Sequence, residues 1–203
     1  MIRRLLPIVL GLGVFTGLPA AGWPAAHVGS QAPDFTLNDA SGRQHSLKQY
    51  ASQFVVLEWF NKDCPFVRKH YDSGNMQKLQ ATYTAREVVW LTISSSAPGR
   101  EGYIAPEAGN AILTEKQARS TALLLDSDGT VGRLYGAKTT PHMFIINPEG
   151  VLIYAGAIDD HPSTDAADIG TATNYVAQAL DEAMDGKPVS TPETASYGCS
   201  VKY

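Results

Sequence analysis

The residues best suited to chemistry are two cysteines, Cys64 and Cys199, in a chain of 203 residues. Cys64 follows an apolar run over residues 54–60 that is typical of a strand, and Pro65 is best tolerated in the first turn of a helix. We therefore expect the Cys64 sulfur to face the unpaired N–H groups where a helix begins. Those donors and the helix dipole favour thiolate over thiol, so the sequence predicts a nucleophilic and reachable sulfur. The alternative is a cysteine that packs in the core as a small hydrophobe.

The number of cysteines limits the chemistry further. A pair can form one disulfide or work as a redox couple, but it cannot supply the thiolates of a cysteine-rich zinc or iron–sulfur site. The expected chemistry therefore requires no metal and no organic cofactor. Glu58, within the apolar run, is either a buried carboxyl with a raised pKa, suited to moving a proton, or an exposed acid at a strand end.

The N-terminal residues have the composition of an export signal. Arg3 and Arg4 precede an apolar run over residues 5–15, which is shorter and more interrupted than a membrane-spanning helix. We expect residues 1–22 to be a secretory signal peptide, so that the mature protein is exported, in a bacterium most simply to the periplasm. A net charge of −4 provides no basic surface, which disfavours nucleic acid as a partner.

Apolar runs alternate with helical spacing along the rest of the chain. Strands are expected at 54–60, 88–93 and 122–125, a hairpin at 139–155, and helices at 65–82, 111–119, 131–135 and 168–185. Parallel strands with crossover helices, followed by a hairpin, imply an α/β fold with a mixed central sheet and helices on both faces. Residues 188–203 are expected to be an irregular C-terminal tail that carries Cys199.

Several of these features together resemble the thioredoxin fold. They are the run Trp59–Val67, which contains Asn-x-x-Cys-Pro-Phe-Val, the pair Thr140–Pro141 before a strand, and the order of strands and helices. The similarity is greatest to the redoxin family, in its peroxiredoxin-like (AhpC/TSA-like) subgroup, whose C-terminal tail the segment Gly198–Ser200 also resembles. The resemblance covers a domain over residues 28–187.

The resemblance also implies roles for single residues. Cys64 matches the first redox cysteine of thioredoxins and the peroxidatic cysteine of peroxiredoxins. Pro141 matches a proline that follows a cis peptide bond and faces the active sulfur. The second thioredoxin cysteine is replaced by Val67, so no Cys-x-x-Cys dithiol can form. The peroxiredoxin threonine is replaced by Asn61, and the later active-site arginine is missing near Pro141.

The leading hypothesis is a thiol-dependent oxidoreductase that reduces peroxides. Cys64 would attack the O–O bond and become a sulfenic acid, and Cys199 would condense with it to a disulfide. An external thiol reductant, either a thioredoxin-like protein or a low-molecular-weight thiol, would open that disulfide. Asn61 would hydrogen-bond a peroxide oxygen or, alternatively, cap the end of the strand.

Two other functions remain open. Cys64 could attack disulfides of proteins or small molecules, with Pro141 shaping the substrate groove, and the missing arginine favours this reaction. The chain could instead be a non-enzymatic binding or metal-delivery protein, although the histidines available to join Cys64 lack the usual ligand spacing: His70, His142 and His161.

Overall fold

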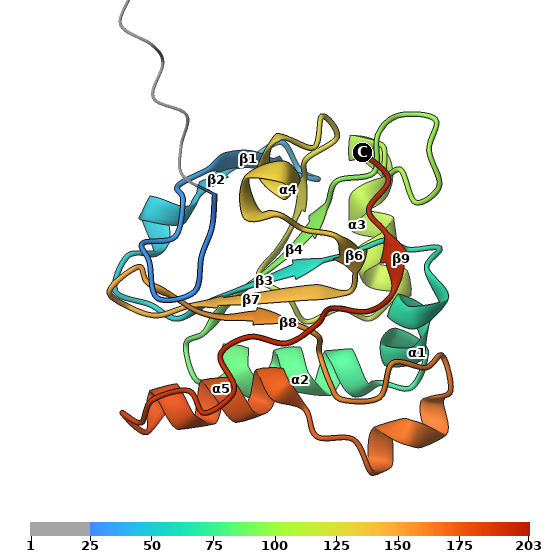
Figure 1. Ribbon diagram of the computed structural model, residues 1–203. Coiled ribbons are helices and arrows are strands. Elements are labelled where there is room, and N and C mark those ends of the chain that lie inside the picture. The colour runs from blue at the N-terminus through green and yellow to red at the C-terminus, as the bar shows by residue number, and fades with distance from the viewer. Residues whose placement is uncertain (1–24) are drawn as a thin grey trace, which may run out of the picture.

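The structure is a computed structural model that describes residues 25–203 (Figure 1). The expected signal peptide, residues 1–22, lies outside the described residues and stays a prediction. Within residues 25–203 there is no helix with the length and apolar character that crossing a membrane would require.

A seven-stranded mixed sheet forms the centre of the molecule, in the order β2-β1-β5-β4-β3-β7-β8. The inner strands β3, β4 and β5 run parallel, whereas β7 and β8 continue the sheet as an antiparallel hairpin. This arrangement confirms the predicted mixed sheet. The strands are β1 Thr36–Asp39, β2 Gln44–Ser46, β3 Val55–Trp59, β4 Val89–Ser94, β5 Ala122–Leu125, β7 His142–Ile146 and β8 Leu152–Gly156.

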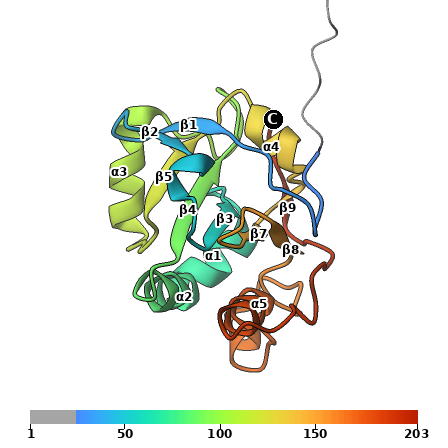
Figure 2. The ribbon, with the colours of Figure 1, turned by 90° about the vertical axis from the view of Figure 1, so that its left-hand side faces the viewer.

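Helices cover both faces of this sheet, as predicted. One face packs against α1, α2, α3 and α5, and the other packs against α4 and a short 3-10 helix, η1. Figure 2 shows the layers from the side, with α2 and α5 below the strands and α4 above them. The helices are η1 Leu47–Tyr50, α1 Pro65–Asp72, α2 Asn75–Thr84, α3 Pro106–Glu115, α4 Thr130–Tyr135, η2 Ala166–Gly170 and α5 Tyr175–Met184.

Three predicted helix boundaries were wrong. The helix expected over 65–82 is two helices, because Gly74 between α1 and α2 has a φ of 77°, a left-handed conformation that ends a helix. The helix expected at 111–119 already begins at Pro106, which suits a first helical turn. The helix expected at 168–185 begins at Tyr175, because the Asn174 side chain caps it by accepting from the Ala177 N–H at 2.8 Å.

The segment expected to be an irregular tail is partly ordered. It runs back beside β8, where the Ala155 N–H donates to the Pro192 carbonyl at 3.1 Å. It then forms strand β9, Cys199–Ser200, which pairs antiparallel with β6, Thr139–Thr140. In Figure 1, this red segment crosses the end of the molecule where β3 leads into α1. The departure from irregular structure arises because β6 offers unpaired backbone groups that β9 satisfies.

Glu58 lies in β3 and is completely buried. It is therefore a buried carboxyl, the first of the two environments expected for it, and not an exposed acid at a strand end. Its carboxylate accepts from the Tyr71 hydroxyl at 2.9 Å and from the Trp90 indole N–H at 2.8 Å. Gln80 and Thr92 donate to it at 3.0 and 3.3 Å. Burial raises the pKa of Glu58 more than these hydrogen bonds lower it.

We expect the unfolding free energy of the wild type to fall, relative to that of Glu58→Gln, as the pH rises from about 4 to about 8. The raised pKa means that the folded state binds a proton which the unfolded state has released. The difference should amount to about 1.4 kcal/mol for each unit that separates the folded and unfolded pKa values. Urea unfolding of both proteins across this range measures it. Parallel pH profiles would show that Glu58 titrates equally in both states.

Candidate active site

Cys64 lies where β3 leads into α1, and the predicted strand-to-helix junction is confirmed. It is the N-cap residue of α1, in an extended conformation with φ −69° and ψ 124°, and Pro65 is the first residue of the helix. The Cys64 N–H donates to the Asn61 carbonyl at 3.2 Å, which closes a tight turn between strand and helix. This turn directs the sulfur toward the start of the helix.

The Cys64 sulfur contacts the segment that contains Pro141. The thiol donates to the Thr140 carbonyl at 3.0 Å, and the Thr140–Pro141 peptide bond is cis. The Thr140 hydroxyl oxygen is buried and has no hydrogen-bond partner. When Cys64 is a neutral thiol, it donates to the Thr140 carbonyl and the Thr140 hydroxyl has no partner. A Cys64 thiolate can only accept hydrogen bonds, so it would give the Thr140 hydroxyl a partner.

Cys199 reaches the same place from the far end of the chain. In the β6–β9 pair it lies directly opposite Thr140, and its side chain is near enough to Cys64 for the two thiols to shift each other's pKa. Both cysteines are free thiols. The structure therefore brings together three residues singled out in the sequence: Cys64, Pro141 and Cys199.

The two thiols are not equivalent. Burial acts to raise the pKa of Cys64, but the hydrogen bonds that its thiolate would accept from the side chains of Cys199 and Thr140 and from the Val67 backbone outweigh it, and the net pKa lies below the ordinary value. Burial, together with the neighbouring Cys64 sulfur, raises the pKa of Cys199 to about 12. Cys64 is therefore the more acidic thiol of the pair, and Cys199 holds its proton more firmly.

The expectation of a reachable sulfur was wrong for this conformation, because Cys64 is 0% exposed. Part of its surroundings is the hydrophobic core beneath α1. The rest belongs to the C-terminal segment, in which Gly198 lies against Thr140 so closely that a Cβ there would overlap the Thr140 carbonyl oxygen. Cys199 itself is only partly buried.

Asn61 makes the contacts of a turn cap. Its side-chain oxygen accepts from the Asp63 N–H at 2.8 Å, and its amide nitrogen donates to the Glu101 carbonyl at 3.4 Å. Both bonds are to backbone groups of the loops around Cys64. Of the two roles expected for Asn61, these contacts suit the capping role.

The side chains of the three histidines have different hydrogen-bond partners. His142 Nδ1 accepts from the Lys138 N–H at 3.2 Å, His161 pairs with Asp160, and His70 contacts Asn75 and Tyr197. Within residues 25–203, no group of three or more His, Cys, Asp or Glu side chains is arranged to hold a metal ion.

Sequence reasoning named Thr140 only as the residue before Pro141 and gave its side chain no role, and it missed Tyr197. Tyr197 carried no sequence signal beyond its closeness to Cys199, because its partners come from distant parts of the chain.

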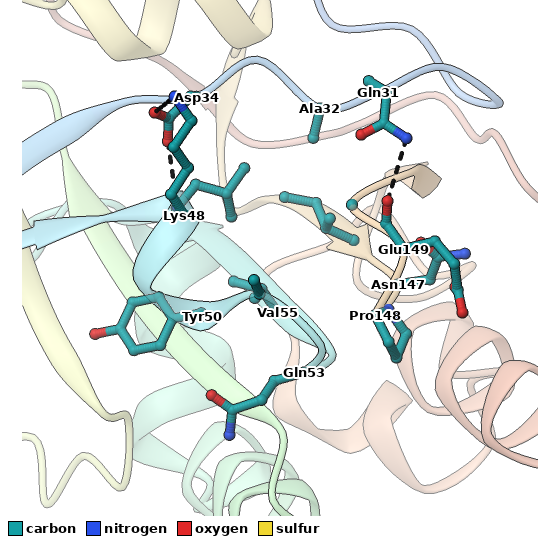
Figure 3. A pocket seen from close by; sticks show the side chains of 14 residues that line it. Gln31, Ala32, Asp34, Lys48, Tyr50, Gln53, Val55, Asn147, Pro148 and Glu149 are labelled. Atoms are coloured by element: carbon teal, nitrogen blue, oxygen red, sulfur yellow. Dashed lines mark hydrogen bonds and ion pairs between the residues drawn. The ribbon is translucent and has the colours of Figure 1, made fainter.

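The described residues also line a cavity of about 250 Å³ at the opposite end of β3 (Figure 3). Two contacts cross its rim: Lys48 pairs with Asp34 at 3.2 Å, and the Gln31 amide donates to the Glu149 carbonyl at 3.1 Å. Val55, the first residue of β3, lies in the wall, whereas Cys64 follows the last residue of that strand. No cysteine or histidine is among the residues that line the cavity.

The sequence model of the AhpC/TSA family matches residues 28–155. The thiol-disulfide oxidoreductase ResA of Geobacillus thermodenitrificans is 26% identical over 126 residues, which cover 62% of this chain and 67% of the relative. A hypothetical protein from Sinorhizobium meliloti superimposes with a TM-score of 0.74 at 25% identity, over 88% of this chain and 96% of that one. The thioredoxin domain of a thiol-disulfide oxidoreductase from Bacteroides vulgatus superimposes with a TM-score of 0.50 at 20% identity, over 64% of this chain and 89% of that one.

These likenesses confirm two predictions, the thioredoxin-like α/β fold and an oxidoreductase enzyme. The narrower subgroup, with its Asn-x-x-Cys-Pro-Phe-Val motif, stays a prediction.

We expect Thr140→Val to raise the pKa of Cys64, because the variant keeps the shape of the side chain but cannot donate to the thiolate. Thr140→Ser retains the hydroxyl and is the matched control. Thiolate absorbance followed against pH in a Cys199→Ser background measures the effect, since a single cysteine then titrates. Equal titration curves for the valine and serine variants would exclude this role of Thr140.

Proposed function

Because the chain belongs to the AhpC/TSA family, we propose that it is a thiol-disulfide oxidoreductase whose working pair is Cys64 and Cys199. The observation that carries this proposal is the register of β9 on β6, which sets Cys199 opposite Thr140 and against the Cys64 sulfur. A second thiol from the C-terminal segment thus stands in for the cysteine that Val67 replaces. The curated relatives named thiol-disulfide oxidoreductases support the same reaction.

The first half of the reaction is an attack by Cys64. Its thiolate attacks one sulfur of a substrate disulfide, a bond forms between Cys64 and that sulfur, and the other substrate sulfur leaves as a thiolate that takes up a proton. The lowered pKa of Cys64 raises the fraction of thiolate available for this step.

The second half releases the substrate. Cys199 loses its proton to the departing sulfur and attacks Cys64, so that the mixed disulfide becomes a Cys64–Cys199 disulfide and the substrate leaves as a second thiol. The substrate has then gained two electrons and the protein has lost them. An external thiol reductant opens the internal disulfide and returns the protein to the dithiol form. The same steps in reverse oxidise a substrate dithiol.

The neighbouring residues have positioning roles in this proposal. Asn61 holds the turn that precedes Cys64, and Pro141 sets the Thr140 carbonyl and hydroxyl beside the sulfur. We also propose that the protein acts after export, with residues 1–22 as its signal peptide, where disulfide substrates are available.

Peroxide reduction, the leading hypothesis from the sequence, would use the same Cys64 thiolate and has less support. The Asn61 amide donates to the Glu101 carbonyl, so it is engaged with the backbone. No arginine follows Arg133 in the sequence, so no arginine of the later chain is available beside Pro141 to stabilise the leaving oxygen.

Treatment of the reduced protein with glutathione disulfide tests the proposal. We expect the wild type to form the Cys64–Cys199 disulfide, because Cys199 displaces glutathione from Cys64. Cys199→Ser should stop at a glutathione adduct on Cys64, and Cys64→Ser should form no internal disulfide. Mass spectrometry of the alkylated protein distinguishes these products.

Hydrogen peroxide applied to the same three proteins separates the two activities. If peroxide oxidises Cys64 much faster than it oxidises free cysteine, while glutathione disulfide leaves Cys199→Ser unmodified, the enzyme is a peroxidase and the proposal fails.

A further inference from the structure

The covered state of Cys64 depends on one segment, residues 197–203, which we call the strap. Its backbone follows the edge of the site: β9 pairs with β6, the Val201 N–H donates to the Lys138 carbonyl at 3.1 Å, and the Ala97 N–H donates to the Lys202 carbonyl at 2.8 Å. In the part of the chain that the structure describes, β9 is the only strand that pairs with β6. Another extended chain could therefore pair with β6 only after the strap has left.

A first anchor holds the strap at Tyr197. The Tyr197 hydroxyl donates to the Asp159 carboxylate and lies 3.3 Å from His70 Nε2, and its ring packs on Phe66 with the ring centroids 5.8 Å apart. Asp159 and His70 are almost wholly buried. Because Tyr197 precedes Cys199 by two residues, this anchor fixes where the Cys199 sulfur lies.

A second anchor holds the strap at Tyr203, on α4. The Tyr203 hydroxyl donates to the Ala137 carbonyl at 2.8 Å, and the Arg133 guanidinium lies 4.5 Å from the centre of its ring. The ring lies directly against Gly132, where a Cβ would come within 2.5 Å of the Tyr203 hydroxyl oxygen. Because any side chain larger than glycine at position 132 would overlap the Tyr203 ring, α4 offers a specific binding site for the end of the strap.

The two anchors differ in exposure. Both tyrosines are half-buried, and both anchors include buried groups. The difference is that Tyr197 bonds to the buried side chains of Asp159 and His70, whereas one of the partners of Tyr203, Arg133, is exposed to solvent. Contacts at the surface open at a lower free energy than contacts in the interior, so the strap is expected to release from the Tyr203 end.

We propose that the strap gates Cys64: it releases at Tyr203 and leaves β6 so that the disulfide of another protein can reach Cys64, and Tyr197 then returns Cys199 to the sulfur. This inference rests on the proposed function. A protein disulfide needs the space that β9 occupies, since its flanking chain must pass over Thr140. A small disulfide needs less of that space.

The test compares two substrates in a Cys199→Ser background, in which adducts on Cys64 accumulate. We expect Tyr203→Ala to react with insulin, a protein disulfide, about tenfold faster or more, because the variant loses a hydrogen bond and a cation–π contact that hold the strap closed. The gain with glutathione disulfide should be smaller. Tyr203→Phe keeps the ring on Arg133 and serves as the matched control, with an effect well below that of the alanine variant. Gly132→Ala should reproduce the gain without a change in the strap itself.

Hydrogen exchange on the same variants tests the strap without any substrate. The amides of Val201 and Ala97 should exchange faster in Tyr203→Ala, while core amides such as that of Trp90 stay protected. Unchanged exchange at Val201 and Ala97 would overturn the proposal. An unchanged rate of reaction with insulin, in variants that still react with glutathione disulfide, would also overturn the gating proposal, and it would leave the proposed function intact.

The proposed function fails separately. If no variant reacts with either disulfide although Val201 exchanges faster, the proposed function is overturned and the opening of the strap is supported.

Discussion

The site depends on the short antiparallel pairing of β9 with β6. The sheet places Cys64 at the end of β3 and Thr140 beside it, but the helix that follows offers Val67 where a second thiol would stand. The register that sets Cys199 opposite Thr140 brings a second thiol to this place. Because side chains alternate between faces along a strand, a shift of β9 by one residue would turn the Cys199 side chain away from Cys64. The anchors at Tyr197 and Tyr203 flank the pair and oppose such a shift.

The same pairing explains why the two thiols differ. The Cys64 thiolate would accept hydrogen bonds from the side chains of Cys199 and Thr140 and from the start of α1, and these outweigh the effect of its burial on the pKa. Cys199 lies against a sulfur that becomes negatively charged, which favours its protonated form. The contact between the two thiols therefore lowers the pKa of Cys64 and raises that of Cys199. Both effects would be lost if β9 separated from β6.

Local sequence signals predicted the strands and helices well, but they did not predict which distant segments contact one another. The apolar run before Cys64 and the proline after it fix a strand-to-helix junction by local sterics alone, and that junction is present. The break at Gly74 and the cap at Asn174 shifted helix ends, because one backbone conformation or one side-chain hydrogen bond decides such boundaries. The hypothesis that Cys199 condenses with Cys64 came without a structural basis, because the strand pairing that places Cys199 joins segments far apart in the sequence. The covering of Cys64 escaped prediction for the same reason: an irregular tail gives no sign that Gly198 fits against Thr140 or that Tyr203 fits against Gly132.

The asymmetry of the pair also bears on how the proposed internal disulfide is reduced. Cys64 is sealed from solvent, whereas Cys199 is partly exposed on the strap, so an incoming thiol meets the Cys199 sulfur first. Attack there expels Cys64, and a thiol of lower pKa is the better leaving group. The sulfur that attacks the substrate in one half of the cycle is therefore the sulfur that leaves in the other half. This order differs from one in which the reductant attacks the nucleophilic cysteine, because here the strap shields that cysteine and presents its partner.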